Sequence, residues 1–161
     1  MAVNKYKIEV KPNKVLKYEL KNNEISGTNA FIICTSDEDL EIDIEPKIVL
    51  NFDDITTDKI NSFTEYHAKR IKSFVDKIKN IDTLYVCCDY GVSRSAAIAA
   101  AIRRYKKQNE NIIWCDPKYN PNILVYKILC RELGLKNTKL RLKYKLYLNK
   151  KALKKAINKT R

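Results

Sequence analysis

The chain has 161 residues, of which 45% are hydrophobic, so its length and apolar content are those of a single ordinary domain. No apolar run follows a basic start and none is long enough to cross a bilayer, which argues against secretion or a membrane span. Five cysteines without a C-x-x-C pair and a single histidine argue against a disulfide framework or a structural metal. We therefore expect a cytoplasmic protein with free thiols, without a metal or organic cofactor.

The net charge of +13 is unevenly distributed along the chain. Residues 1–81 carry 13 basic and 14 acidic side chains, and residues 82–135 carry 8 and 5. Residues 136–161 carry 11 basic side chains and no acidic ones. This predicts a nearly neutral domain over residues 1–135 and a basic extension over residues 136–161. The extension could pack on the domain, or bind nucleic acid or another acidic partner through its charge.

The first half of the chain is predicted to form strands and one clear helix. Residues 3–20 mix β-branched and aromatic residues with lysines, which favours two short strands and a turn. The apolar runs 31–34 and 47–52 each lead into acidic residues, as buried strands ending in polar loops do. Apolar residues recur at helical spacing over residues 62–80, with Asp58 or Asn61 as the predicted cap. His67 lies on the apolar stripe of this helix and is interpreted as a core residue.

The second half continues the alternation of strands and helices. We predict a strand over residues 83–87, an Ala-rich helix over 93–107, and a helix over 122–133 with Pro121 in its first turn and Gly134 after its end. Residues 140–148 fit the spacing of a strand and of a helix equally well. The order implies a three-layer α/β domain with a mostly parallel central sheet flanked by helices.

The segment Cys88-Asp89-Tyr90-Gly91-Val92-Ser93-Arg94-Ser95 joins a predicted buried strand to a predicted helix. A sharp turn at such a joint points successive backbone N–H groups into one concavity, where the helix N-terminus adds partial positive charge. Gly91 can adopt the positive φ that the turn requires. We predict a phosphate-binding loop made by the backbone of Asp89, Tyr90, Gly91, Val92 and Ser93 and by the planar guanidinium of Arg94.

The same field should act on the thiol of Cys88 and make it a thiolate nucleophile at neutral pH. The Ser95 hydroxyl could hydrogen-bond this sulfur. A proton donor for a leaving oxygen would come from the loop after the 47–52 strand, because parallel strands deliver such loops to one sheet edge. Asp53 and Asp54 are the first candidates there, and Asp58 is the third.

Cys88 to Ser95 matches the C-x-x-G-x-x-R-S/T signature of the cysteine-dependent protein tyrosine phosphatases. Residues 51–102 resemble their dual-specificity branch, particularly small bacterial and phage-type members, and the weaker likeness extends over residues 47–133. The resemblance implies a phosphatase acting on phosphorylated proteins or peptides through a phosphocysteine, with Cys88, Arg94 and Ser95 as catalytic residues. It also implies Asp54 as the general acid, since the family's acid lies about thirty residues before the cysteine.

One position departs from the family pattern and leaves alternatives open. The residue before the nucleophile is usually His, which helps to stabilise the thiolate, whereas this chain has Cys87. A phosphate-recognition module without turnover is therefore an alternative. A phosphatase of RNA 5′ ends or phosphoinositides is another, although relatives of that kind tend to carry lysines in the loop, where this chain has Asp89. The remaining cysteines, Cys34, Cys115 and Cys130, are interpreted as small buried hydrophobic residues.

Overall fold

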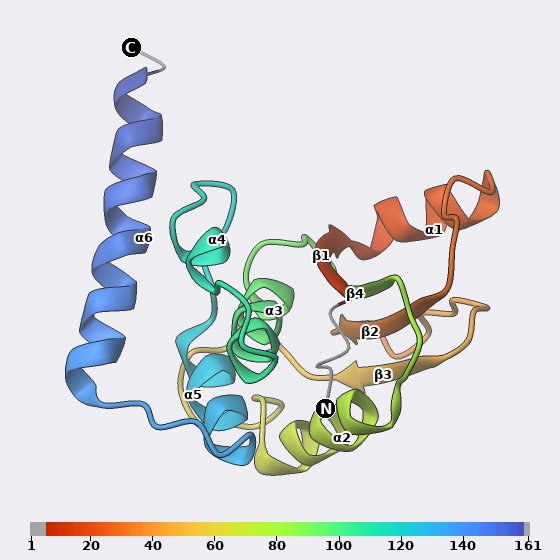
Figure 1. Ribbon diagram of the computed structural model, residues 1–161, viewed down its shortest axis with the longest axis horizontal. Coiled ribbons are helices and arrows are strands. Elements are labelled where there is room, and N and C mark those ends of the chain that lie inside the picture. Colours follow the sequence, from red (N-terminus) through yellow and green to blue (C-terminus); the bar gives the residue numbers. More distant parts are fainter. Residues whose placement is uncertain (1–5, 160–161) are drawn as a thin grey trace.

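The computed structural model describes residues 6–159, which form four strands and six helices around one sheet (Figure 1). In chain order the elements are β1 (Lys7–Pro12), α1 (Asn13–Lys21), β2 (Asn29–Thr35), β3 (Lys47–Asn51), α2 (Glu65–Lys77), β4 (Thr83–Cys88), α3 (Arg94–Tyr105), α4 (Asn111–Trp114), α5 (Ile123–Glu132) and α6 (Lys139–Lys159). The α/β class predicted from the sequence is confirmed. None of the helices in residues 6–159 has the length and apolar character needed to cross a bilayer.

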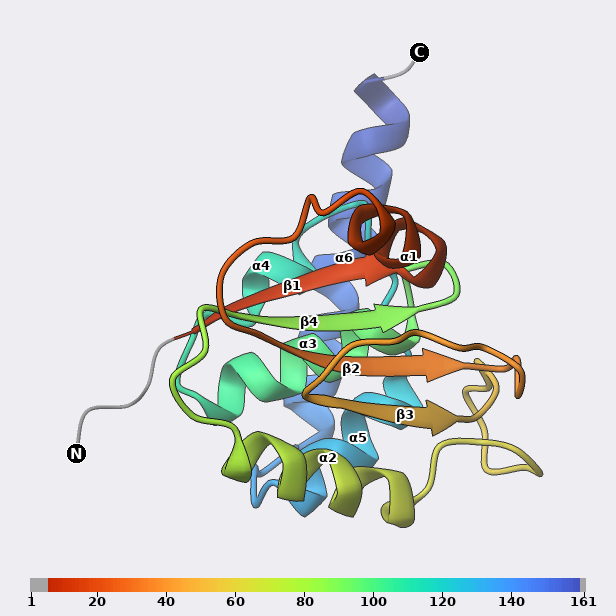
Figure 2. The ribbon, with the colours of Figure 1, turned by 90° about the vertical axis from the view of Figure 1, so that its right-hand side faces the viewer.

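The sheet has the strand order β1-β4-β2-β3, and all of its pairings are parallel. The sequence predicted a mostly parallel sheet, and the observed sheet is entirely parallel. Figure 2 shows the four strands side by side with their carboxyl ends along the same edge. The loops that follow β2, β3 and β4 therefore start from one side of the domain, which is where ligands bind in open parallel sheets.

Each face of the sheet is apolar and each is covered. Helices α2, α3 and α5 lie on one face, and α1 lies on the other (Figures 1 and 2). Leu84, Val86 and Cys88 of β4 point into the larger core, whereas Tyr85 and Cys87 point toward α1. This alternation along one strand is consistent with a three-layer arrangement, because a strand buried on both faces needs apolar partners on both.

The prediction of two strands and a turn for residues 3–20 is wrong in its second half. The first strand forms as β1, and the part of the prediction before Tyr6 lies outside the described residues. The chain then continues directly into α1 after Pro12, whose backbone is extended and occupies the helix N-cap. Leu16 is fully buried against the sheet, so burial on one helix face overrides the β-branched and aromatic content.

Two helix caps also differ from expectation. Helix α2 is capped by Thr64, and not by Asp58 or Asn61; the Thr64 backbone N–H donates to Nδ1 of His67 over 3.0 Å. His67 is half-buried and packs beside Phe52 and Phe63, so its role is structural. Helix α5 begins after Asn122, whose side chain accepts from two backbone N–H groups, so Pro121 precedes the helix.

The basic extension forms one long helix, α6, which resolves the ambiguity of residues 140–148. It packs along α4, and its carboxyl half projects beyond the rest of the chain in both views (Figures 1 and 2). Lys145 and Asn149 on its inner face are buried. Lys145 reaches Asn111 Oδ1 over 2.5 Å, and Asn149 donates to the carbonyl of Tyr119 over 2.8 Å.

Glu110 is the buried carboxylate that fixes α6 to the domain. It accepts hydrogen bonds from Trp114, from Tyr126 over 2.6 Å and from Arg141, and it pairs with Lys145 over 3.1 Å. Burial alone would raise the pKa of Glu110. The hydrogen bonds from Tyr126 and Lys145 and the charges of Lys145 and Arg141 outweigh burial and lower this pKa.

We expect Glu110→Gln to lower the free energy of unfolding by about 3 kcal/mol at neutral pH, because it leaves Lys145 buried without its charge partner. Since the folded pKa of Glu110 lies below its ordinary value, its stabilisation is complete above about pH 4.5 and is lost as the pH falls further. Urea denaturation of both proteins should therefore show a difference that shrinks below this pH. The exposed Glu24→Gln is the matched control, and an equal loss in that variant would contradict the role of Glu110.

Candidate functional site

The loop between β4 and α3 lies at the carboxyl edge of the sheet and turns sharply around Gly91. Gly91 has φ of +65°, as the sequence predicts, so a residue with a side chain would be strained there. A Cβ at this position would also lie 2.6 Å from the backbone nitrogen of Pro12 and 2.7 Å from the carbonyl carbon of Lys11. The loop therefore lies directly on the end of β1, and only glycine fits.

The polar groups of the loop backbone are divided between two sides. The carbonyl groups of Val92 and Ser93 accept hydrogen bonds from the N–H groups of Asn120 and Asn122, over 3.0 Å and 3.2 Å. The N–H groups of residues 90–93, in contrast, donate to no other residue that the structure describes. They remain free to donate to a ligand, next to the N-terminus of α3 with its partial positive charge.

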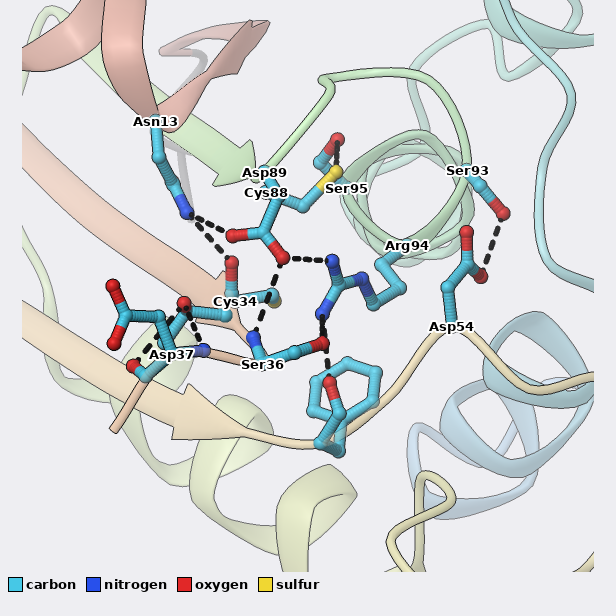
Figure 3. Close-up of polar contacts among 12 residues, drawn as sticks. Asn13, Cys34, Ser36, Asp37, Asp54, Cys88, Asp89, Ser93, Arg94 and Ser95 are labelled. Atoms are coloured by element: carbon cyan, nitrogen blue, oxygen red, sulfur yellow. Dashed lines mark hydrogen bonds and ion pairs between the residues drawn. The ribbon is translucent and has the colours of Figure 1, made fainter. Parts of the chain in front are cut away.

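Cys88 is the last residue of β4 and is almost completely buried. Its Sγ lies 2.9 Å from Oγ of Ser95, in the first turn of α3 (Figure 3). The two residues predicted to be nucleophile and hydroxyl partner are thus in direct contact. The hydroxyl can donate to a thiolate and stabilise its charge.

Arg94 is held by three acceptors around one end of its guanidinium. Nη1 donates to Oγ of Ser36 over 3.0 Å and to the carbonyl of Phe52 over 2.7 Å, and Nη2 donates to Oδ2 of Asp89 over 2.5 Å. Its Nε donates to no other described residue. The side chain is only 4% exposed, so this buried cation needs the carboxylate beside it.

Asp89 connects the loop to the N-terminal part of the chain. Its carboxylate lies between Asn13, which donates to Oδ1 over 3.1 Å, and Arg94 (Figure 3). Burial alone would raise the pKa of Asp89, but the hydrogen bond and charge of Arg94 outweigh burial and lower it. The side chain of Asp89 therefore supports Arg94, and only its backbone could serve as the predicted phosphate contact.

Sequence reasoning missed Asn13 and Ser36, which complete this network. Asn13 is buried at the start of α1 and also donates to the carbonyl of Cys34. Both residues are far from the loop in sequence, and an isolated Asn or Ser has no recognisable spacing. The sequence could have indicated Ser36 only through its position: it follows β2 and therefore lies at the same sheet edge as Cys88.

Asp54 lies beside the loop, on the side of Arg94 away from Asp89 in the view of Figure 3. Its Oδ1 accepts from the Ser93 hydroxyl over 2.9 Å and from Nδ2 of Asn122 over 2.7 Å, while Oδ2 is free of other described residues. Asp54 shares an open hollow with Cys88 and Arg94; its other lining residues are Thr56, Tyr90, Val92, Ser93 and Asn120. Asp53 and Asp58 do not line this hollow, so Asp54 is the aspartate that the structure brings to the predicted nucleophile.

The other cysteines do not line this hollow. Cys87 points to the opposite face of the sheet from Cys88, and burial raises the pKa of its thiol. Cys34 and Cys130 are buried as expected, but Cys115 is exposed, which corrects the prediction for that residue. Residues 6–159 contain no group of three or more His, Cys, Asp or Glu side chains placed to hold a metal ion.

Comparison with known proteins assigns no family to the chain: no family model matches it, and no curated protein matches it significantly.

A comparison of Gly91→Ala with Gly134→Ala should isolate the contact between the loop and β1. Both glycines have positive φ, but a Cβ at Gly134 would have no neighbour within 4 Å. We expect Gly134→Ala to cost about 1 kcal/mol of stability from backbone strain alone. Gly91→Ala should cost about 1 to 3 kcal/mol more, because the added methyl overlaps Pro12. Urea denaturation measures both, and equal losses would contradict the close approach.

Proposed function

We propose that the protein hydrolyses phosphomonoesters through a covalent phosphocysteine formed on Cys88. The observation that carries the proposal is the sharing of one hollow by the Cys88 thiol, the Arg94 guanidinium and the Asp54 carboxylate at the N-terminus of α3. The free N–H groups of residues 90–93 lie on the loop that bounds this hollow. A nucleophile, a set of anion-binding donors and a carboxylate acid are the three groups that this chemistry requires.

In the first step, the Cys88 thiolate attacks the phosphorus atom and forms an S–P bond as the P–O bond to the leaving group breaks. The loop N–H groups and Nε of Arg94 donate to the phosphoryl oxygens, where negative charge is greatest in the transition state. Asp54 gives its proton to the leaving oxygen, which departs as a neutral alcohol or phenol.

In the second step, water attacks the phosphocysteine. The Asp54 carboxylate accepts a proton from this water, the new P–O bond forms and the S–P bond breaks. Inorganic phosphate leaves, and the sulfur regains its negative charge. The Ser95 hydroxyl, 2.9 Å from Sγ, can donate to the departing thiolate and so favours this step.

The proposed substrates are phosphorylated proteins or peptides, with phosphotyrosine favoured by the resemblance of the loop to the protein tyrosine phosphatases. The charges of the loop side chains are compatible with a substrate that carries a single phosphate group. Its one acidic side chain, Asp89, is paired with Arg94, and residues 88–95 contain no lysine. This composition does not favour the highly charged ends of RNA or phosphoinositides.

We expect wild-type protein to hydrolyse p-nitrophenyl phosphate under reducing conditions in the presence of a chelator, and Cys88→Ser to abolish turnover. A serine hydroxyl at this position lacks the ionised sulfur that attacks phosphorus. Release of p-nitrophenol, followed by absorbance, measures the rate. Cys115→Ser is the control, because this exposed thiol lies outside the hollow and should be dispensable.

An inactive but folded wild-type protein would overturn the enzyme proposal. Retention of a phosphotyrosine peptide by that protein without turnover would then identify a phosphate-recognition module. Turnover that survives in Cys88→Ser would exclude the thiol mechanism.

Asp54→Asn should separate protonation of the leaving group from the other steps. We expect about 10²- to 10⁴-fold loss of kcat with phenyl phosphate, whose leaving oxygen is basic and needs a proton. The loss with p-nitrophenyl phosphate should be much smaller, because that phenolate leaves without protonation. Asp53→Asn is the matched control, and a dependence on leaving group in that variant instead would assign the acid to Asp53.

A further inference from the structure

Helix α6 carries a dense positive charge, most of which is not compensated by ion pairs. Residues 139–159 contain nine Lys or Arg side chains and no acidic one. Two of the nine, Arg141 and Lys145, pair with Glu110 on the inner side. The other seven form no ion pair with another residue in the described part of the chain; they are Lys139, Lys143, Lys150, Lys151, Lys154, Lys155 and Lys159.

The anchoring of α6 determines which of its residues face solvent. Lys145 and Asn149 are buried on the domain, so the opposite side of the helix points outward. Residues spaced by three or four positions share one face of a helix. Lys143, Lys150 and Lys154 follow this spacing with Tyr147 between them, and all four are exposed. The outward face therefore carries a row of ammonium groups on a fixed support.

Aromatic side chains are interleaved with these lysines. Tyr144 is 53% exposed and Tyr147 is 57% exposed, and neither packs its ring against another aromatic ring of the described chain. An exposed tyrosine offers a flat surface on which a nucleobase can stack, and neighbouring lysines can contact the phosphates that follow. Side chains of both kinds thus occur together on α6.

A hollow beside α6 extends this surface toward the end of α3. Arg104, Lys107, Arg141 and Tyr144 are among its lining residues, together with Glu110, which pairs with Arg141. Arg104 donates to the neutral oxygens of Asn137 and of the Lys136 carbonyl, so its charge is not compensated by these contacts. The buried Nε of Arg141 has no hydrogen-bond partner. The hollow therefore offers the guanidinium of Arg104 and the ammonium of Lys107, which form no ion pair in the described part of the chain, near an exposed ring.

From these observations we propose that α6 and the adjoining hollow bind single-stranded nucleic acid. The phosphates would lie along Lys143, Lys150 and Lys154, and bases would stack on Tyr144 and Tyr147. This binding is separate from the phosphomonoester site and does not rest on it.

The distribution of side chains disfavours two other occupants. A helix lying in a membrane surface has its apolar residues on one face, whereas the exposed apolar residues of α6 alternate around it with lysines. A second copy would bring two such rows of lysines together, and like charges would repel. A flexible polyanion needs no continuous apolar face and is attracted by the lysines, so neither argument excludes it.

Fluorescence anisotropy of a labelled single-stranded DNA of about 20 nucleotides tests the proposal. The variant Lys143→Gln/Lys150→Gln/Lys154→Gln should bind at least about tenfold more weakly at ~0.1 M salt. It should also reduce the slope of log K against log salt by about 2, since three phosphate contacts are lost. Tyr144→Leu/Tyr147→Leu should weaken binding at least about fivefold without changing this slope.

The matched control is Lys14→Gln/Lys17→Gln/Lys21→Gln, which removes the same charge from exposed positions of α1. Near wild-type binding by this control supports the proposal, whereas equal weakening would overturn it in favour of attraction by net charge alone. Tighter binding of duplex DNA of the same sequence would overturn the single-strand assignment. Binding to phosphatidylserine vesicles with no binding to the oligonucleotide would replace nucleic acid by a lipid surface.

Discussion

The close packing of Gly91 on the backbone of Lys11 and Pro12 is the constraint on which the candidate site depends. β1 and β4 pair with Pro12 opposite Cys88, so the two strands end level with each other. The chain leaving Cys88 has to curl over the end of β1 before α3 can begin, and a side chain at Gly91 would prevent this. The curl places the free N–H groups, the Cys88 sulfur and the N-terminus of α3 together.

A second constraint is the burial of a cation within this curl. Arg94 is almost inaccessible, and a guanidinium in that position is costly without a carboxylate and further acceptors. Asp89 supplies the charge, while Ser36 and the Phe52 carbonyl supply the remaining acceptors. Because Asp89 also contacts Asn13, the orientation of Arg94 depends on β1, α1 and the loop after β2. The N-terminal part of the chain thus belongs to the site.

The sequence predicted those features that depend on local pattern. The apolar runs of β2, β3 and β4, the spacing of α2 and the residues from Cys88 to Ser95 each lie within a short segment. The contacts of Asn13 and Ser36 could not be predicted, because they join residues 76 and 58 positions from their partners. The state of residues 140–148 was ambiguous for a related reason. The helical state of this segment is stabilised by Glu110, which is remote in sequence and forms ion pairs with Arg141 and Lys145 of α6.

Helix α3 links the two surfaces for which we propose anion binding. Its first turn bounds the hollow at Cys88, and its last turn carries Arg103 and Arg104. Cations there offset the partial negative charge of the helix C-terminus, so groups that can interact with an anion lie at both ends of one helix. Twelve residues give this helix a length of about 18 Å. A small phosphate ester can therefore occupy one end at a time, whereas an extended polyanion is long enough to touch both.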